Sequence, residues 1–204
     1  MNRFIKSAVL LLSILVCCSS FVYAGEVTER IRTTLEKVIN TLNDPVLKKD
    51  EMSDQRKSAL HQVLKEVFDE EEFARRSLKG NWGNLSETER KEFTIVFTDL
   101  LETTYFDKIE TYVKEAENFS SANISYVNEK IMGRFAVVGT KINIGNNGCF
   151  AVDYRMIKKN ENWVVCDLVI EGVSIVKNYR AQFNEVLVNS SFSDLILRLK
   201  AKKG

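Results

Sequence analysis

The sequence predicts an α+β fold in which helices cover one face of a four-stranded antiparallel sheet. Apolar residues recur with helical spacing up to about residue 117, and between residues 122 and 171 they alternate with a period of two. Helical spacing then returns. Short turns rich in Gly and Asn separate the alternating segments, which favours an antiparallel meander. A twisted sheet covered in this way leaves a conical space beneath it that side chains need not fill.

Residues 1–24 are predicted to be a signal peptide rather than part of the fold. Two basic residues precede an apolar run over residues 8–16, which is shorter than the ~20 residues that span a bilayer. Small residues ending at Ala24 form the expected cleavage site, and a retained membrane anchor is the alternative. We therefore expect an exported single domain of residues 25–204.

Charge and cysteine content exclude several classes of function. The chain has 29 basic and 28 acidic residues, and loss of the leader would leave 27 and 28. This near-neutral balance argues against a general nucleic-acid-binding protein. Cys149 and Cys166 are expected to be reduced, because they fall on opposite faces of neighbouring strands. No Cys/His cluster has metal-ligand spacing, and we expect no cofactor.

Four helices are expected before the sheet. The first spans Glu26–Leu42, the second begins at Ser53, the third follows a capping Asp69, and the fourth runs to about Glu117. Ser86-Glu87-Thr88-Glu89 at the start of the fourth helix is a capping box, in which the Ser and Glu side chains satisfy each other's backbone amides. Its long aromatic stripe suits a plain core or the wall of a ligand space.

Four strands and two closing helices complete the expected fold. The strands are Ala122–Lys130, Arg134–Ile144, Cys149–Lys158 and Trp163–Glu171. Gly172 ends the last strand, and Ser174 is a plausible N-cap for the next helix. The expected closing helices are Val173–Val188 and Ser193–Lys200.

The third and fourth strands are expected to share one wholly apolar face. Across their hairpin, this face is made by Phe150, Val152, Tyr154 and Met156 opposite Val164, Cys166, Leu168 and Ile170. Asp153, Arg155 and Asp167 fall on the other face, which we expect to be wet. An ion-pair ladder is the better interpretation of these charges than an acid–base pair.

No residue pattern indicates catalysis. His61 is the only histidine, and no nucleophile or acid is arranged with it in a recognisable motif. Glu70-Glu71-Glu72 is typical of a solvated helix start, where carboxylates complement the helix dipole. We therefore expect a protein that is not an enzyme.

Several segments of the mature chain resemble the MlaC family of periplasmic phospholipid-binding proteins, also called toluene-tolerance proteins. The resemblance runs through Phe68-Asp69 and Trp82, and is sharpest at 152–155 and 163–183. It implies an NTF2-like sheet over a cavity for acyl chains. It also implies that phospholipid is shuttled between an outer-membrane MlaA-like lipoprotein with its porin and an inner-membrane MlaD-like component of an ABC transporter, which maintains outer-membrane asymmetry.

Ten apolar residues are expected to line the lipid cavity. They are Phe97, Leu101, Tyr105, Ile109, Val152, Tyr154, Leu168, Ile170, Val173 and Val176. Tyrosine hydroxyls, Arg155 and Arg180 are candidates to meet the glycerol or phosphate, although Arg180 equally suits a structural ion pair. Two alternatives stay open: a binding protein for another apolar molecule, and an NTF2-like enzyme with an ionisable pair inside the cavity.

Overall fold

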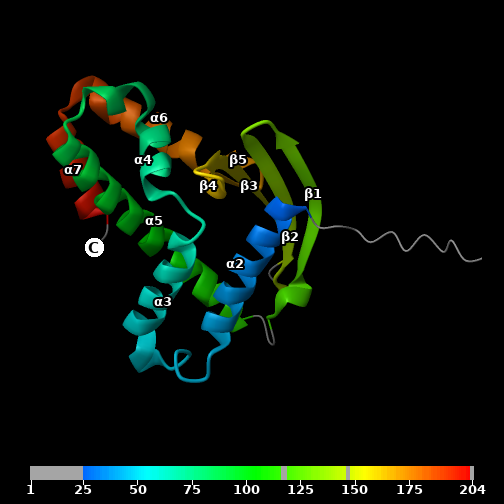
Figure 1. Ribbon diagram of the computed structural model, residues 1–204. Coiled ribbons are helices and arrows are strands. Elements are labelled where there is room, and N and C mark those ends of the chain that lie inside the picture. The colour runs from blue at the N-terminus through cyan, green and yellow to red at the C-terminus, as the bar shows by residue number, and fades with distance from the viewer. Residues whose placement is uncertain (1–24, 116–118, 146–147, 203–204) are drawn as a thin grey trace, which may run out of the picture.

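The computed structural model describes residues 25–115, 119–145 and 148–202, which form helices around one sheet (Figure 1). The helices are α2 (Glu26–Asn43), α3 (Ser53–Lys65), α4 (Glu70–Leu78), α5 (Glu87–Glu115), α6 (Ile175–Asn189) and α7 (Phe192–Ala201). The strands are β1 (Ile124–Met132), β2 (Phe135–Asn143), β3 (Cys149–Lys159), β4 (Asn162–Ile170) and β5 (Val173–Ser174). Within these residues, no helix is long and apolar enough to cross a membrane.

The sheet is an antiparallel meander in the order β1-β2-β3-β4-β5. The predicted α+β class is confirmed, but the sheet has five strands rather than four. Glu171 and Gly172 both have left-handed backbones, with φ of 49° and 78°. Such a two-residue turn folds the chain straight back, so Val173 and Ser174 pair with β4 before α6 begins.

The predicted helix caps at Asp69, Ser86 and Ser174 are confirmed, because they depend on local chemistry, whereas Val173, the predicted start of a closing helix, lies on β5. The Asp69 carboxylate accepts a hydrogen bond from the Glu72 amide at 2.9 Å. Ser86 and Glu89 cap each other reciprocally, and the Ser174 hydroxyl accepts from the Lys177 amide at 3.1 Å. Each cap satisfies an amide that the first helical turn leaves unpaired.

A bulge in β4 overturns part of the predicted apolar face. Met156 pairs with Val165 while Arg155 pairs with Asp167, so Cys166 is the extra residue between them. The extra residue switches which side chains of β4 face the core. Before the bulge Trp163 and Val165 face the core, and only after it do Leu168 and Ile170 take over that face. The prediction was therefore right for Leu168 and Ile170 and wrong for Val164 and Cys166.

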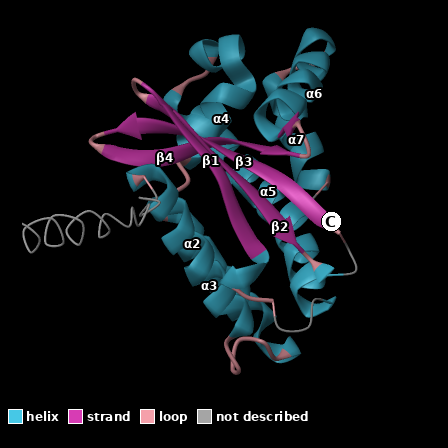
Figure 2. Ribbon diagram, turned by 90° about the vertical axis from the view of Figure 1, so that its right-hand side faces the viewer, coloured by secondary structure: helices cyan, strands magenta, loops and turns pink. Residues whose placement is uncertain are grey.

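Helices pack on the inner face of this sheet (Figure 2). Buried apolar side chains of both layers form the main core between them. The main core joins Val27 and Ile31 of α2 to Phe97 of α5 and to Val138 and Val165 of the sheet, all at most 1% exposed. The predicted NTF2-like cavity thus coincides with a packed interior, and its opening to a ligand stays a prediction.

The opposite face holds the predicted ion pair, in which the Arg155 side chain is 42% exposed but the carboxylate is buried. Arg155 Nη1 donates to Asp167 at 3.1 Å, as expected. Asp167 is nevertheless only 5% exposed. It also accepts from the Ser174 hydroxyl at 2.6 Å and from the Val176 amide at 3.1 Å. The carboxylate therefore anchors the start of α6, where a negative charge is favourable.

Both described cysteines are free thiols, as predicted. Cys149 is exposed, whereas Cys166 is buried in the bulge and donates to the Arg155 carbonyl at 3.4 Å. Burial raises the pKa of the Cys166 thiol to about 11. A thiol that stays protonated in this way is a poor nucleophile.

Candidate functional site

Two neighbouring rows of residues cross the inner face of the sheet and form its apolar centre. In the first row Thr140, Val152 and Ile170 pair directly across β2, β3 and β4. In the second row Tyr154 pairs with Leu168. The sequence prediction that Val152, Tyr154, Leu168 and Ile170 share one face is confirmed, because these four residues form one contiguous block.

Burial falls off from the centre of this block toward its edges. Val152 and Tyr154 are 8% and 6% exposed, while Leu168 and Ile170 are only partly buried. Several other apolar side chains that pack on the main core are also partly exposed. We define the apolar seam as the half-buried residues Leu35, Leu101, Tyr105, Tyr126, Ile142, Leu168 and Ile170. These residues adjoin both core and solvent, as do other partly buried residues packed on the same core, and their contact with a ligand stays a prediction.

The tyrosines around the seam supply polarity without charge. Burial raises the pKa of Tyr105, Tyr126, Tyr154 and Tyr179, so their hydroxyls stay neutral at physiological pH. Thr140 Oγ1 donates to the Val152 carbonyl at 3.1 Å and hydrogen-bonds the Tyr154 hydroxyl. Neutral hydroxyls at the border of an apolar region suit uncharged oxygens such as those of esters and alcohols.

Helices α5 and α6 provide the other predicted residues, with different degrees of burial. Phe97 and Val176 are 1% and 3% exposed, and Leu101 and Tyr105 pack against the same core. Ile109 and Val173 lie at the surface, 41% and 60% exposed. The structure thus brings eight of the ten predicted residues together in or against one core, and their role as ligand lining stays a prediction.

The two arginines proposed for a headgroup lie elsewhere. Arg155 is on the face of the sheet opposite the block, paired with Asp167. The Arg180 guanidinium donates twice to the Arg76 carbonyl, at 3.0 and 2.7 Å, and so joins α6 to α4. Each side chain is engaged in holding elements of the fold together.

Tyr126 is a residue of the seam that sequence reasoning did not select. It pairs with Thr140, and the Arg32 guanidinium of α2 lies 4.2 Å from its ring centroid. Its place in a period-two segment was the available signal, but the register that aligns it with Val152 depends on a β1 bulge. The cation–π contact attaches α2 to the edge of the sheet.

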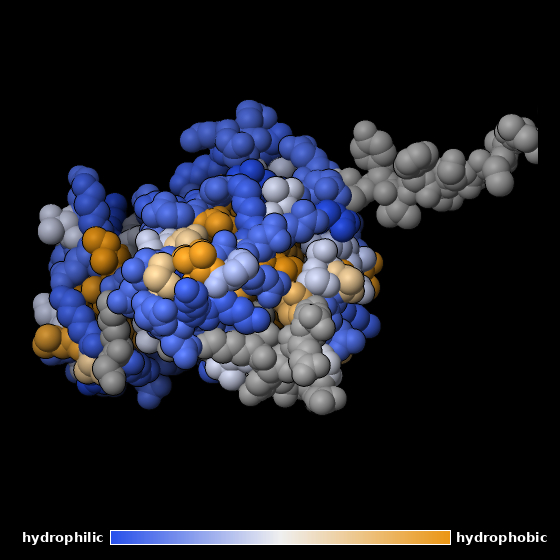
Figure 3. Space-filling model, turned by 90° about the horizontal axis from the view of Figure 1, so that it is seen from below, coloured by the Kyte–Doolittle hydropathy of each residue, from blue (hydrophilic) through white to orange (hydrophobic). Residues whose placement is uncertain are grey.

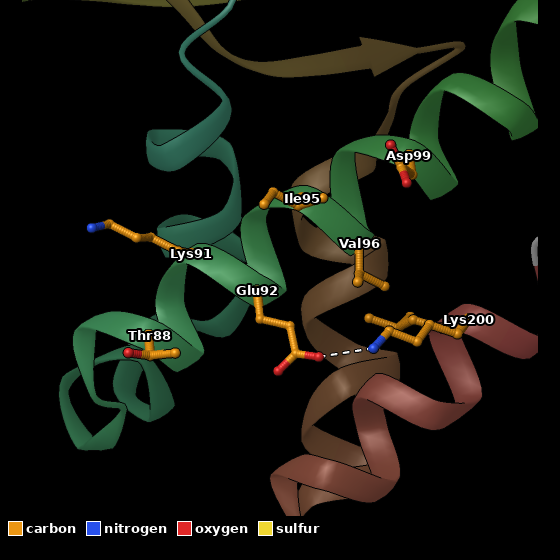
Figure 4. A pocket seen from close by; sticks show the side chains of 8 residues that line it. Thr88, Lys91, Glu92, Ile95, Val96, Asp99 and Lys200 are labelled. Carbon is orange, nitrogen blue, oxygen red and sulfur yellow. Dashed lines mark hydrogen bonds and ion pairs between the residues drawn. The ribbon is translucent and has the colours of Figure 1, made fainter.

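An open groove of about 560 Å³ lies between α5 and α7, away from the predicted residues (Figure 4). Its lining is Thr88, Lys91, Glu92, Ile95, Val96, Asp99, Leu199 and Lys200. Half of these side chains are charged, and Lys200 pairs with Glu92 at 2.8 Å. Acyl chains in this groove would strip water from charges, which is unfavourable. From below, hydrophobic residues also reach the surface in several places framed by hydrophilic ones (Figure 3).

Ionisable residues do not assemble a metal centre in the described part of the chain. No group of three His, Cys, Asp or Glu side chains there is placed to hold a metal. His61 Nδ1 hydrogen-bonds Glu102 of α5, with Glu70 at 4.0 Å from Nε2, which gives the histidine a partly buried structural position. Asp153 and Asp167 lie on the face opposite the apolar block.

Sequence comparison decides the family. The family model described as MlaC protein matches residues 32–201. The chain belongs to the MlaC family. A solved structure of a phospholipid-binding protein from Ralstonia solanacearum, in complex with a phospholipid, shares the fold with a TM-score of 0.73 and 20% identity, over 86% of this chain and 95% of that one. No curated protein matches the sequence. The resemblance to the MlaC family and the α+β fold class predicted from sequence are therefore confirmed.

Proposed function

We propose that this MlaC-family chain is a periplasmic phospholipid carrier that holds acyl chains between the inner face of the sheet and its helices. The observation that carries the proposal is the apolar seam, a half-buried apolar surface continuous with the core. Family membership and the phospholipid bound to the similar Ralstonia protein support it.

The energetics of transfer suit this site. Each methylene removed from water contributes roughly 0.8 kcal/mol, so a chain of about fifteen methylenes gains on the order of 12 kcal/mol before the cost of opening the site. Side chains now occupy the interior, so binding must part α2 and α5 from the sheet. The neutral tyrosines would meet the glycerol and ester oxygens, while the headgroup stays in water.

The proposed route places the carrier between two membranes. Residues 1–24 direct export and are cleaved after Ala24, leaving residues 25–204 in the periplasm. The carrier then exchanges phospholipid between an outer-membrane MlaA-like lipoprotein with its porin and an inner-membrane MlaD-like component of an ABC transporter. Transfer requires only a lower-energy site on the partner, so no catalytic residue is involved.

Native mass spectrometry of the mature protein, purified from periplasm without detergent, tests the proposal. We expect adducts with the mass of diacyl phospholipids, and their loss in Leu168→Trp and Val152→Trp, whose larger side chains fill the site. Val188→Trp is the matched control, because residue 188 is 80% exposed on α6.

Each contrary outcome has a clear meaning. A protein that stays free of adducts after incubation with phospholipid vesicles contradicts the carrier. Adducts of a different apolar compound would identify a binding protein for that compound. Chemical turnover of the bound compound would favour an NTF2-like enzyme.

A further inference from the structure

Exposed apolar side chains gather at the closed end of the β1–β2 hairpin. Ten large apolar side chains are exposed in the described part of the chain, and four lie within residues 127–135. They are Ile131, Met132 and Phe135 at the closed end and Val127 at the β1 bulge, between 43% and 53% exposed. Figure 1 shows this end of the hairpin projecting past the first turn of α2. Exposed apolar groups concentrated in one place mark a surface that another body covers.

These side chains lie on both faces of the hairpin. Ile131 pairs with Ala136 of the core face, whereas Met132 and Phe135 pair with each other on the opposite face. Gly133, with φ of 61°, is the first residue of the two-residue turn between them. A partner protein would typically cover one face of such a hairpin, whereas a bilayer interface would cover the apolar side chains on both faces of its end.

The hairpin end itself carries two positive charges, while the neighbouring Arg76 is ion-paired with Glu72. Lys130 and Arg134 are exposed, and residues 130–135 include no acidic side chain. The guanidinium groups of Arg134 and Arg76 lie 5.8 and 6.0 Å from the Phe135 ring centroid. The nearest carboxylate in sequence, Glu129, is turned toward α2, where it accepts from the Thr28 amide and hydroxyl at 2.7 and 2.6 Å.

We propose that the hairpin end, residues 130–135, enters the headgroup region of an anionic phospholipid bilayer. Apolar side chains ringed by lysine and arginine are the composition of an interfacial anchor, in which apolar burial and attraction to anionic lipid act together. The contact goes beyond the carriage of lipid, because it uses residues outside the apolar seam. A carrier that loses its cargo would still bind the membrane.

Vesicle co-sedimentation tests the contact with the mature protein. We expect binding to phosphatidylcholine vesicles that contain phosphatidylglycerol, weaker binding to pure phosphatidylcholine, and loss of binding at high salt. Met132→Ser combined with Phe135→Ser is expected to weaken binding about fivefold or more. Val188→Ser with Leu197→Ser, exposed positions on α6 and α7, is the matched apolar control and should bind like the wild type.

A charge pair and a fluorescent probe complete the test. Lys130→Glu with Arg134→Glu should abolish the preference for phosphatidylglycerol, while Lys48→Glu with Lys49→Glu should keep it. A Phe135→Trp probe should shift to the blue and be quenched by brominated acyl chains, because Trp82 and Trp163 are already buried. Absence of vesicle binding at low salt, or equal binding by hairpin and control variants, overturns the proposal and leaves a partner protein as the occupant. Native mass spectrometry of the same variants reports cargo separately.

Discussion

Two apolar regions of this chain differ in how far they are shielded from solvent. Among the helices, Phe93, Phe97 and Phe183 are at most 2% exposed, and their ring centroids lie 5.2 to 5.4 Å apart. In the apolar seam, residues such as Tyr105 and Leu168 pack on the same core yet remain partly exposed. The aromatic cluster is enclosed by other apolar side chains and stabilises the fold, whereas the seam is a partly exposed apolar surface that we propose contacts the lipid.

Different contacts hold the structural elements around the two regions together. The aromatic cluster is held by ring packing, which any opening would forfeit. Helix α2, which covers the sheet beside the seam, is attached both by apolar packing of Val27 and Ile31 and by polar contacts. Arg30 Nε donates to the Trp163 carbonyl at 2.7 Å, and Arg32 stacks on Tyr126. Water can replace such polar bonds at modest net cost, whereas the packing of Val27 and Ile31 would be lost if α2 left the sheet.

The largest expected effect is in the aromatic cluster. Phe97→Ala should lower the free energy of unfolding by about 3–5 kcal/mol, because it leaves a cavity among packed rings. Urea denaturation measures the loss. Ile95→Ala on the same helix removes a side chain that is 62% exposed and should change stability by less than about 0.5 kcal/mol. Equal effects would show that the cluster is not the stabilising region.

The next effect concerns the buried carboxylate on the other face of the sheet. Asp167→Ala should cost about 3 kcal/mol, since Ser174 and the first turn of α6 lose their acceptor. Asp153→Ala, on the neighbouring strand and more exposed, is the control and should cost far less. Thermal unfolding of both variants makes the comparison, and a small effect at Asp167 would mean that α6 is held by packing alone.

The seam should respond more weakly in stability and more strongly in binding. Leu168→Ala should cost about 1–2 kcal/mol, because that side chain is only partly buried. Retention of phospholipid should nevertheless fall, as measured by lipid extraction from the purified variant. A loss of stability as large as that of Phe97→Ala, with lipid unchanged, would place Leu168 in the core and remove the distinction between the regions.

The smallest expected effect on stability comes from Glu72, which lies outside both regions and is ion-paired with Arg75 and Arg76. Burial raises the pKa of Glu72, but hydrogen bonds from Arg75 and Arg76 outweigh it, so the pKa falls below 4.5. The carboxylate therefore stabilises the fold above its unfolded pKa of 4.5, and this contribution is lost as pH falls through the folded value.

Each unit of that pKa shift corresponds to roughly 1.4 kcal/mol. Thermal midpoints measured from about pH 6 down to about pH 3 should fall more steeply for the wild type than for Glu72→Gln. Parallel curves for the two proteins would contradict the assignment.

Features set by neighbouring residues could be predicted from sequence. The caps at Asp69, Ser86 and Ser174 need only a side chain and an amide three residues away, and all three are confirmed. Glu72 shows the limit of such reasoning. The prediction that Glu72 belongs to a solvated run is wrong. Glu72 is only 8% exposed, and it forms ion pairs with two arginines on its own helix.

The candidate site depends on longer-range geometry that the alternation of residues does not encode. The bulge at Cys166 reverses the faces of β4, and no local pattern marks it. Val173 was assigned to a helix but lies on β5, where it points to the surface. Ile109 continues the stripe of α5, yet the neighbouring Phe106 belongs to a separate small core with Leu42 and Leu60. Helix α5 therefore contributes residues to both the main core and this smaller core.

Site-specific photocrosslinking to bound lipid tests most directly whether acyl chains lie against the seam. A photoreactive phenylalanine analogue would replace Leu168 or Tyr105 in the seam, and Ile95 or Val188 as exposed controls, in protein purified with its lipid. We predict phospholipid crosslinks from the two seam positions and none from the controls. Crosslinks from Ile95, in the groove between α5 and α7, with none from the seam, would place the lipid in that groove and contradict the account.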